Sequence, residues 1–247
     1  MTDRERIDKL MVRRQLAGSR ERARALIMAG RVLVDEQPVD KAGTQIDSEA
    51  TIRLKGEDIP YVSRGGLKLA RALEVFQVTV AGRVALDVGA STGGFTDCLL
   101  QNGARKVFAV DVGYGQLAWK LRDDQRVVNL ERTNIRHLAA DQLDETPHLA
   151  VIDASFISLA KVLPATLAHL QPASDIIALI KPQFEVGKGQ VGKGGVVRDP
   201  EQHLQVIENI KLIADTSGCQ VVSTCESPIR GPKGNREFLI HLCTGRR

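Results

Sequence analysis

The sequence predicts an α/β fold in which a doubly wound, mostly parallel sheet follows a small α+β domain. Three observations support this prediction. Beyond about residue 65, short apolar runs alternate with helical patterns, which is typical of strands and helices that alternate around a parallel sheet. The preceding segment instead shows two short helical patterns followed by short alternating strands. A glycine-rich turn follows the first apolar run of the longer part, as in folds that bind nucleotide-like ligands.

Composition narrows the class of protein. The chain has 247 residues, of which 43% are hydrophobic and 26% are charged, which is ordinary for a soluble globular protein. No apolar run is long enough to span a membrane, and the N-terminus is charged rather than signal-like. The four cysteines form no C-x-x-C pair, and no H-E-x-x-H is present. We therefore expect a cytoplasmic protein with no metal site and no membrane partner.

The N-terminal part is basic. Helical patterns cover residues 7–17 and 20–30, with Ser19 as the expected N-cap of the second helix and Gly30 as its stop. Short strands are expected at 31–36, 37–41 and 50–56. Residues 1–31 hold nine basic and four acidic residues, a surplus larger than the net charge of +4 of the whole chain. This distribution favours a module that binds a polyanion, although a solvated helix face would have the same composition.

The same part resembles the S4-like RNA-binding domain. The resemblance rests on RIDKL at 6–10, SRERA at 19–23 and LIMAGRVLV at 26–34. It implies that basic residues of the second helix and the following strand meet structured RNA, which is consistent with phosphate neutralisation by a basic helix face. Pro60 interrupts the pattern, so we expect an S4-like domain at 1–59, a linker at 60–64 and a second domain at 65–247.

The second domain is expected to open with a helix over 66–76. Further strands are expected at 84–88, 106–111, 126–130, 149–153, 175–181, 219–227 and 237–242. Helices are expected between them at 95–102, 117–122, 159–170 and 200–217. This alternation is the basis for the doubly wound sheet.

The turn after the first strand of this domain suggests the cofactor. It reads DVGASTGGF at 87–95, and Ser91 stands where a dinucleotide fold has its second glycine. Asp87 would repel a pyrophosphate but suits an ammonium or sulfonium group. Asp111 ends the next strand, where a carboxylate can bind both hydroxyls of a ribose. The pattern therefore fits S-adenosylmethionine better than NAD, while an unoccupied tight turn is the alternative.

A second glycine-rich segment, GKGQVGKGG at 187–195, resembles a phosphate-binding P-loop without being one. Gly194 replaces the Ser or Thr that would hold Mg²⁺, and the segment lies well before the next expected helix. We expect a substrate lid whose Lys188 and Lys193 meet RNA phosphates. A plain surface loop is the alternative.

The acceptor of the methyl group is suggested by elimination. The segment after the fourth strand reads Asp153-Ala-Ser-Phe156, without the prolines typical of amine methylation, and no cysteine lies where a pyrimidine C5 enzyme needs its nucleophile. A ribose hydroxyl needs a base and a field that stabilises the alkoxide. Residues at or near strand ends could supply both: Lys68, Asp153, Lys181 and Glu237. Taken singly, each could instead form an ordinary surface ion pair.

This domain resembles the FtsJ-type ribose 2′-O-methyltransferases, and the whole chain resembles the TlyA family of rRNA (cytidine-2′-O)-methyltransferases. The matching stretches are YVSRGGLK at 61–68, DVGASTGGF at 87–95, VIDASF at 151–156, IKPQFE at 180–185, GGVVRDP at 194–200 and GNREF at 234–238. The resemblance implies a Rossmann-like class I methyltransferase sheet whose last strand is antiparallel. It also implies a catalytic Lys-Asp-Lys-Glu set, with Lys181 as base, Asp153 orienting it, Lys68 at the ribose and Glu237 completing the network.

The expected ligands follow from this resemblance. The cofactor is S-adenosylmethionine, and the partner is ribosomal RNA or a ribosomal subunit, with the large-subunit 23S rRNA favoured, no DNA expected and a monomer as the working form. The cofactor residues would be Asp87, Gly89, Ser91, Gly93, Gly94, Phe95, Asp111, Asn134 and Asp153. The RNA-binding residues would be Arg4, Arg6, Arg20, Lys41, Arg64, Lys188 and Lys193.

Two other functions compete with this one. The chain could be an RNA-binding protein whose methyltransferase fold does not catalyse, against which the intact Lys-Asp-Lys-Glu set argues. The family also carries the label haemolysin, but a pore-forming protein needs a spanning or strongly amphipathic segment, and the sequence offers none.

Overall fold

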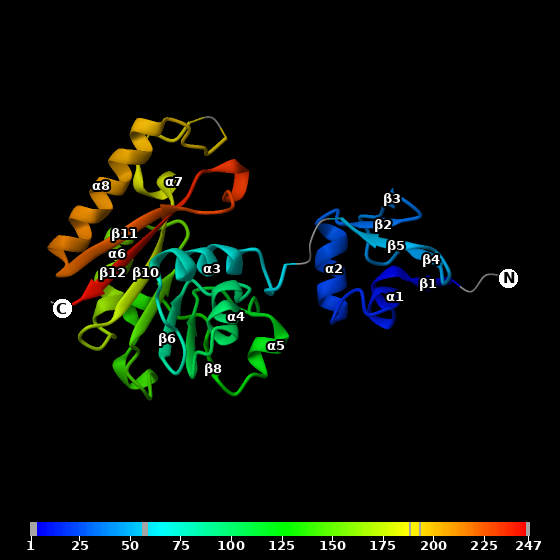
Figure 1. The fold of residues 1–247 in the computed structure, drawn as a ribbon, viewed down its shortest axis with the longest axis horizontal. Helices are drawn as coiled ribbons and strands as arrows, with labels where there is room; N and C mark the ends of the chain where they lie inside the picture. The colour runs from blue at the N-terminus through cyan, green and yellow to red at the C-terminus, as the bar shows by residue number, and fades with distance from the viewer. Residues whose placement is uncertain (1–3, 56–58, 188, 193, 246–247) are drawn as a thin grey trace. The chain divides into compact units, whose positions relative to one another are not determined.

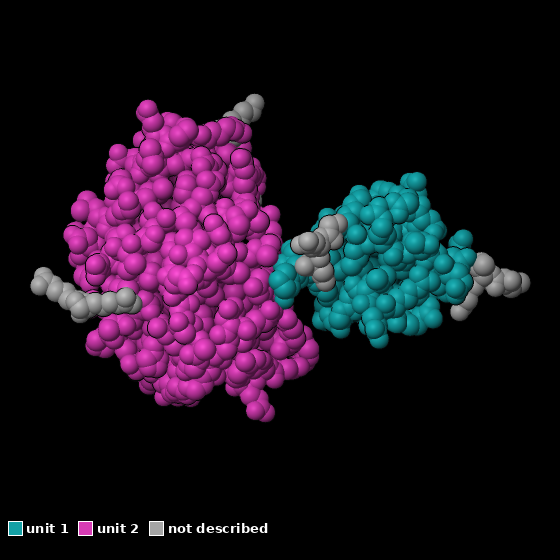
Figure 2. All heavy atoms as spheres, viewed as in Figure 1, with its two compact units in different colours: residues 1–60 teal, residues 61–247 magenta. Residues whose placement is uncertain are grey.

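The computed structural model describes residues 4–55, 59–187, 189–192 and 194–245. The chain forms two compact units, residues 1–60 and residues 61–247, which Figure 2 colours separately. Within the described ranges, no helix combines the length and the apolar character that crossing a bilayer requires.

The first unit is a small α+β domain around two helices. Its elements are β1 (Arg4–Arg6), α1 (Ile7–Arg13), α2 (Arg20–Met28), β2 (Val32–Val34), β3 (Gln37–Pro38), β4 (Gln45–Asp47) and β5 (Ile52–Leu54). The helices pack their apolar faces together through Ile7, Leu10 and Ile27, which are fully buried. β2 pairs with both β3 and β5, and β1 pairs with β4, all antiparallel. The core is small, as expected for a unit of 60 residues.

The expected cap and stop of the second helix are confirmed. The Ser19 hydroxyl accepts a hydrogen bond from the backbone of Arg22 at 3.1 Å, and Gly30 has a φ of +66°. The first helix, however, ends at Arg13 and not at residue 17 as predicted, because Gln15 takes a left-handed φ of +59° that breaks the helical repeat. The short pairing of β1 with β4 was not predicted either, since three-residue strands carry too little alternation to recognise.

The second unit contains a seven-stranded sheet, counted over the described residues. Its strands are β6 (Val84–Val88), β7 (Lys106–Val110), β8 (Val127–Leu130), β9 (Leu149–Ile152), β10 (Asp175–Ile180), β11 (Cys219–Glu226) and β12 (Phe238–Thr244). The spatial order is β11-β12-β10-β9-β6-β7-β8. β12 runs antiparallel to its neighbours β10 and β11, and the other pairs are parallel. The mostly parallel sheet with an antiparallel last strand is therefore confirmed.

Helices cover both faces of this sheet (Figure 1). They are α3 (Gly65–Phe76), α4 (Gly94–Gln101), α5 (Trp119–Arg122), α6 (Leu159–Leu167), α7 (Pro182–Glu185) and α8 (Pro200–Thr216). One apolar core joins α3, α4 and α5 to the sheet through residues such as Leu69, Leu99 and Leu121. A second core joins α6 and α8 to the other face, through Leu163 and Ile210 among others. The sheet is thus buried on both sides, as its apolar strands require.

The strand order reverses beside β6, and this reversal positions the site. The chain passes from β6 to β7 on one side and later returns to β9 on the other, so the loops after β6 and β9 diverge and leave a crevice at their carboxyl ends. The two loops start in close contact, because the backbone of Asp153 donates to Val88 at 2.9 Å. A side chain at Gly89 would clash here, since its Cβ would lie 2.8 Å from the Asp153 carbonyl oxygen.

Candidate active site

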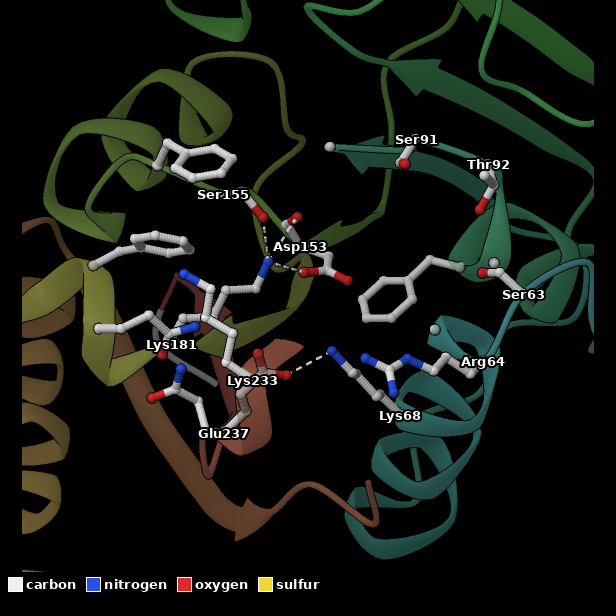
Figure 3. A pocket seen from close by; sticks show the side chains of 18 of the residues that line it. Ser63, Arg64, Lys68, Ser91, Thr92, Asp153, Ser155, Lys181, Lys233 and Glu237 are labelled. Atoms are coloured by element: carbon white, nitrogen blue, oxygen red, sulfur yellow. Dashed lines mark hydrogen bonds and ion pairs between the residues drawn. The ribbon is translucent and has the colours of Figure 1, made fainter. Parts of the chain in front are cut away.

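A cavity of about 590 Å³ opens at this crevice (Figure 3). It is lined by the first turn of α3, the turn after β6, the ends of β9 and β10, and the turn that leads into β12. All four residues of the predicted catalytic set line it: Lys68, Asp153, Lys181 and Glu237. They come from four separate segments of the chain, so only the folded sheet brings them together.

Lys181 and Asp153 form one ion pair of this set. Lys181 directly follows β10, and its Nζ lies 2.5 Å from the Oδ1 of Asp153, the residue directly after β9. The same nitrogen donates to the hydroxyl of Ser155 at 2.8 Å and approaches the Asp153 carbonyl oxygen at 3.4 Å. Three acceptors around one ammonium fix its position, because each restricts the rotation of a side chain that is otherwise flexible. The buried Lys181 nitrogen is therefore held at the edge of the cavity.

Lys68 and Glu237 form the second ion pair, and both are buried. The Lys68 Nζ donates to the Glu237 Oε2 at 2.6 Å, which links α3 to the residue just before β12. The other carboxylate oxygen packs against Gly231, where an added Cβ would lie only 2.0 Å from it. Glycine at position 231 thus leaves the room that the Glu237 carboxylate occupies. Each lysine of the set is paired with one carboxylate.

The glycine-rich turn after β6 forms one wall of the cavity. Gly89, Ser91, Gly94 and Phe95 line it, whereas Gly93 lies next to the lining residues and packs against Leu121. Ser91 has a left-handed φ of +49°, and a Cβ at Gly94 would meet the Ser63 hydroxyl at 2.3 Å. The absence of side chains at these glycines lets the backbone come close to a bound molecule.

Asp87 lies beneath this turn, in the middle of the sheet, and does not line the cavity. It is fully buried, and its Oδ2 accepts from the Thr96 hydroxyl at 2.6 Å. The pKa of this carboxyl is raised to about 7: burial raises it most, the charges of Asp153 and Asp111 also raise it, and the hydrogen bonds from Thr96 lower it. The Asp87 Oδ1 has no hydrogen-bond partner among the described residues. Such an orphaned acceptor fits a ligand that carries an ammonium group.

Asp111 and Asn134 lie outside the cavity lining. Asp111 directly follows β7, and its two carboxylate oxygens accept from the backbone of Ser91 at 2.8 Å and of Gly113 at 2.7 Å. Each oxygen keeps a lone pair for a further donor such as a ribose hydroxyl. Asn134 instead caps a short 3₁₀ helix by accepting from the backbone of Arg136, which is a sufficient structural role. The glycine cradle, the orphaned Asp87 oxygen and the free lone pairs of Asp111 together fit S-adenosylmethionine.

Several lining residues were not among the predicted site residues, and Phe156, Phe184 and Lys233 are the most notable of them. Phe156 is 90% exposed with a left-handed φ of +64°, and its ring packs on that of Phe184 at 5.1 Å between centroids. Lys233, in the turn before β12, also has a positive φ of +61°. The sequence gives little reason to predict a role for these residues, because a single aromatic residue or lysine in a loop is common. The predicted RNA-binding residue Arg64 does line the cavity.

The other predicted RNA-binding residues lie in the first unit or outside the described chain. Arg6 and Arg20 each lie 3.0 Å from the carboxylate of Asp8, which is fully buried, and Arg24 approaches the same carboxylate. Sequence reasoning missed Asp8, which holds three guanidinium groups together and leaves a positive surplus. Arg4 lies in β1 and Lys41 is exposed in a turn, while Lys188 and Lys193 fall outside the described residues.

A buried polar network occupies the opposite edge of the sheet. The Asp175 carboxylate accepts from His241 Nε2 at 2.8 Å and lies 2.6 Å from the Arg83 guanidinium, and Cys243 Sγ is 3.2 Å away. The ligand atoms of Asp175, His241 and Cys243 lie within 4.8 Å of one another. Because Arg83 already neutralises the carboxylate, the group is explained as an internal hydrogen-bond network that ties β10 to β12.

Comparison with known proteins adds to this geometry. Residues 61–244 match the FtsJ-like methyltransferase family, and residues 5–52 match the S4 domain. The chain is 49% identical over 245 residues, 99% of its own length and 91% of the relative's, to the 16S/23S rRNA (cytidine-2′-O)-methyltransferase TlyA of Mycobacterium tuberculosis. It is 37% identical over 182 residues, 73% of its length and 70% of the relative's, to the 23S rRNA (cytidine-2′-O)-methyltransferase TlyA of Campylobacter jejuni.

A solved structure is similar over nearly the whole chain. It comes from a Streptococcus thermophilus protein provisionally named a hemolysin, with a TM-score of 0.78 and 45% identity, and the match covers 99% of this chain and 90% of that one. The expected resemblance in sequence and in fold is therefore confirmed.

Proposed function

This chain belongs to the FtsJ-like methyltransferase family, and we propose that it transfers a methyl group from S-adenosylmethionine to the 2′-hydroxyl of a cytidine in ribosomal RNA. The observation that carries the proposal is the set of two lysines and two carboxylates, paired two by two around one cavity. The names of the two TlyA relatives, which are cytidine-2′-O-methyltransferases, support the choice of acceptor.

Each residue of the catalytic set has a separate role in the proposed reaction. S-adenosylmethionine supplies an electrophilic methyl group when it is bound. The 2′-hydroxyl must lose its proton as the new O–CH₃ bond forms, and we assign this proton to the Nζ of Lys181 in its neutral form. Asp153 and Ser155 hold that nitrogen in place. The Lys68–Glu237 pair would orient the ribose and stabilise the developing negative charge on its oxygen.

The polar groups of the cavity and an exposed aromatic ring support an RNA substrate. Phe156 stands at the cavity with a largely exposed ring, which is a suitable surface for stacking a nucleobase. Arg64 adds a cation at the same place. In the first unit, the arginines gathered around Asp8 offer a positive surface for the phosphates of folded RNA.

We infer that the substrate includes large-subunit rRNA. The names of both TlyA relatives include 23S rRNA, and only one of them also includes 16S rRNA. A ribosomal substrate would also place the protein in the cytoplasm. Whether this chain modifies both subunits is decided by offering purified small and large subunits separately in the same methylation reaction.

The experiment that tests the function compares Lys181→Ala with wild type and with Lys211→Ala. Lys211 is on α8 and pairs with Glu208 at the surface, so its loss should not affect the reaction. Transfer of radiolabelled methyl to rRNA should fall by at least about 10²-fold in Lys181→Ala, while RNA binding and cofactor binding stay within about twofold. Full methylation by Lys181→Ala would refute the role of this lysine. RNA binding without methylation by the wild type would favour a non-catalytic binding module.

A further inference from the structure

A second hollow, of about 420 Å³, adjoins the catalytic cavity. Its lining residues are Val196, Val197, Arg198, His203, Arg230, Lys233, Gly234 and Arg236. Lys233 lines both cavities, so the hollow, which we call the basic pocket, lies directly beside the Lys-Asp-Lys-Glu set. None of the residues that we assign to cofactor binding lines it.

The basic pocket holds an excess of positive charge. Arg198, Arg230 and Lys233 are exposed, and within the described part of the chain none of them has a carboxylate in ion-pair range. Only Arg236 is neutralised, through a two-point pair with Glu226 at 2.6 and 2.9 Å. The pKa of Glu226 is lowered, first by this hydrogen bond and further by the charges of Arg236 and Arg230. Three cations around one hollow are therefore available to an anion.

The two walls of the basic pocket are joined by one buried side chain, that of Asn235. Its Oδ1 accepts from the backbone of Val197 at 3.1 Å, and its Nδ2 donates to the carbonyl oxygen of Gly195 at 3.0 Å. Its own carbonyl accepts from Gly231 at 2.9 Å. These bonds hold the loop before α8 against the turn between β11 and β12, which lie side by side in Figure 1.

The floor of the basic pocket is also fixed. His203, in the first turns of α8, is buried, and its Nε2 hydrogen-bonds to the carbonyl oxygen of Val197 at 3.0 Å. Its ring packs against Phe238 of β12. The arginines thus project from a backbone that is held from both sides, so binding an anion requires little reordering of the loop.

We propose that the basic pocket binds a phosphodiester group of the RNA strand, next to the nucleotide whose ribose enters the catalytic cavity. S-adenosylmethionine carries no phosphate, so it offers no phosphate group to which these cations could bind. An RNA strand carries one phosphate per nucleotide, and Lys233 lines both hollows, so a strand whose ribose enters the catalytic cavity can place a neighbouring phosphate in the basic pocket. Guanidinium groups match the planar, two-point geometry of phosphate oxygens. The proposal rests on the proposed function.

The test removes two arginines that touch neither the catalytic set nor the cofactor turn. In the variant Arg198→Ala/Arg230→Ala, the KM for rRNA in methyl transfer should rise about tenfold, while kcat and the affinity for S-adenosylmethionine stay within about twofold. The dependence of KM on salt should also become weaker, because fewer counterions are released. Arg198→Lys/Arg230→Lys should recover part of the lost affinity, since the charge remains but the planar geometry is lost.

The matched control removes two charges elsewhere on the same unit. Arg105 pairs with Glu145 before β7, and Lys211 pairs with Glu208 on α8, so neither lies at the basic pocket. Arg105→Ala/Lys211→Ala should keep the wild-type KM. If this control raises the KM as much as the pocket variant does, the effect is one of net charge and the proposal is wrong.

The remaining outcomes separate this inference from the proposed function. If the wild type methylates no rRNA, the function fails, and direct binding of rRNA by the wild type and the pocket variant still tests the pocket. If the wild type methylates but the pocket variant has an unchanged KM, the pocket proposal alone is overturned. Competition by inorganic phosphate at constant ionic strength, with an unchanged KM for rRNA in the variant, would indicate a site for free phosphate. A defect on whole subunits but not on naked rRNA would indicate a protein partner.

Discussion

Replacement of Asp87 by asparagine should stabilise the protein and weaken its cofactor binding at the same time. The Asp87 carboxyl is fully buried, and its pKa rises from an ordinary value of 3.8 to about 7, mainly because of burial. Its folded-state pKa is raised, so its stabilising contribution is complete below pH 3.8 and is lost as the pH rises through 7. A shift of about three units, at 1.36 kcal/mol each, costs the ionised protein about 4 kcal/mol at pH 8.

Asparagine can still accept the Thr96 hydrogen bond but does not titrate, so it avoids this cost. The free energy of unfolding of Asp87→Asn, measured by urea denaturation without cofactor, should exceed that of wild type by about 2–4 kcal/mol at pH 8. The gain should shrink to about 1–2 kcal/mol at pH 5, where the wild-type carboxyl is largely protonated.

Binding should respond in the opposite direction. We expect ionised Asp87 to attract the ammonium group of S-adenosylmethionine, so the affinity of the wild type for this cofactor should increase between pH 6 and 8, and the variant should bind weakly at both. Isothermal titration calorimetry measures both affinities. An unchanged or lower stability of the variant at pH 8, together with wild-type affinity, would refute the account of this residue.

Three further changes test other parts of the structure. Gly231→Ala places a methyl group on the Glu237 carboxylate and should lower kcat about 10²-fold in a fold that still binds the cofactor; a wild-type rate would contradict the packing described here. Asp8→Asn removes the carboxylate that holds the arginines of the first unit together, so it should lower the stability of this unit by about 1 kcal/mol and weaken RNA binding. Hydrogen exchange of residues 4–54 measures the stability, and filter binding measures the RNA affinity. Unchanged exchange protection of residues 4–54 would contradict this role of Asp8. Phe156→Ala should reduce kcat/KM for rRNA about tenfold or more and leave cofactor binding intact, and equal kcat/KM would remove the stacking role of this ring.

The sheet could be predicted from the sequence because its strands are buried on both faces. The runs Val84–Val88, Leu149–Ile152 and Asp175–Ile180 are mostly apolar, and Asp153 and Lys181 directly follow the second and third of them. The positions of Lys181 and Asp153 at the carboxyl edge follow from this, since parallel strands end at the same edge. The pairing of Lys68 with Glu237 could not be predicted, because these residues are 169 positions apart and meet only when β12 inserts beside β10.

The loop before α8 was the least predictable part of the site. Its glycines and lysines resemble a P-loop, but α8 begins at Pro200 with Asp199 as its N-cap, so the glycine segment does not open a helix. What fixes the loop is Asn235, a residue forty positions away from the Gly195 that it contacts. No local pattern encodes such a contact. Asp8 is similar, because a single acid in a basic segment gives no sign that several arginines will gather around it.

The central claim is that this site methylates a ribose hydroxyl of cytidine, and nucleoside analysis tests it most directly. Purified large and small ribosomal subunits are incubated with the protein and radiolabelled S-adenosylmethionine, and the rRNA is digested to nucleosides and separated. The account predicts label in 2′-O-methylcytidine, with none in the Lys181→Ala reaction. Label in a base-methylated nucleoside, or tight cofactor binding with no label in any rRNA, would contradict it.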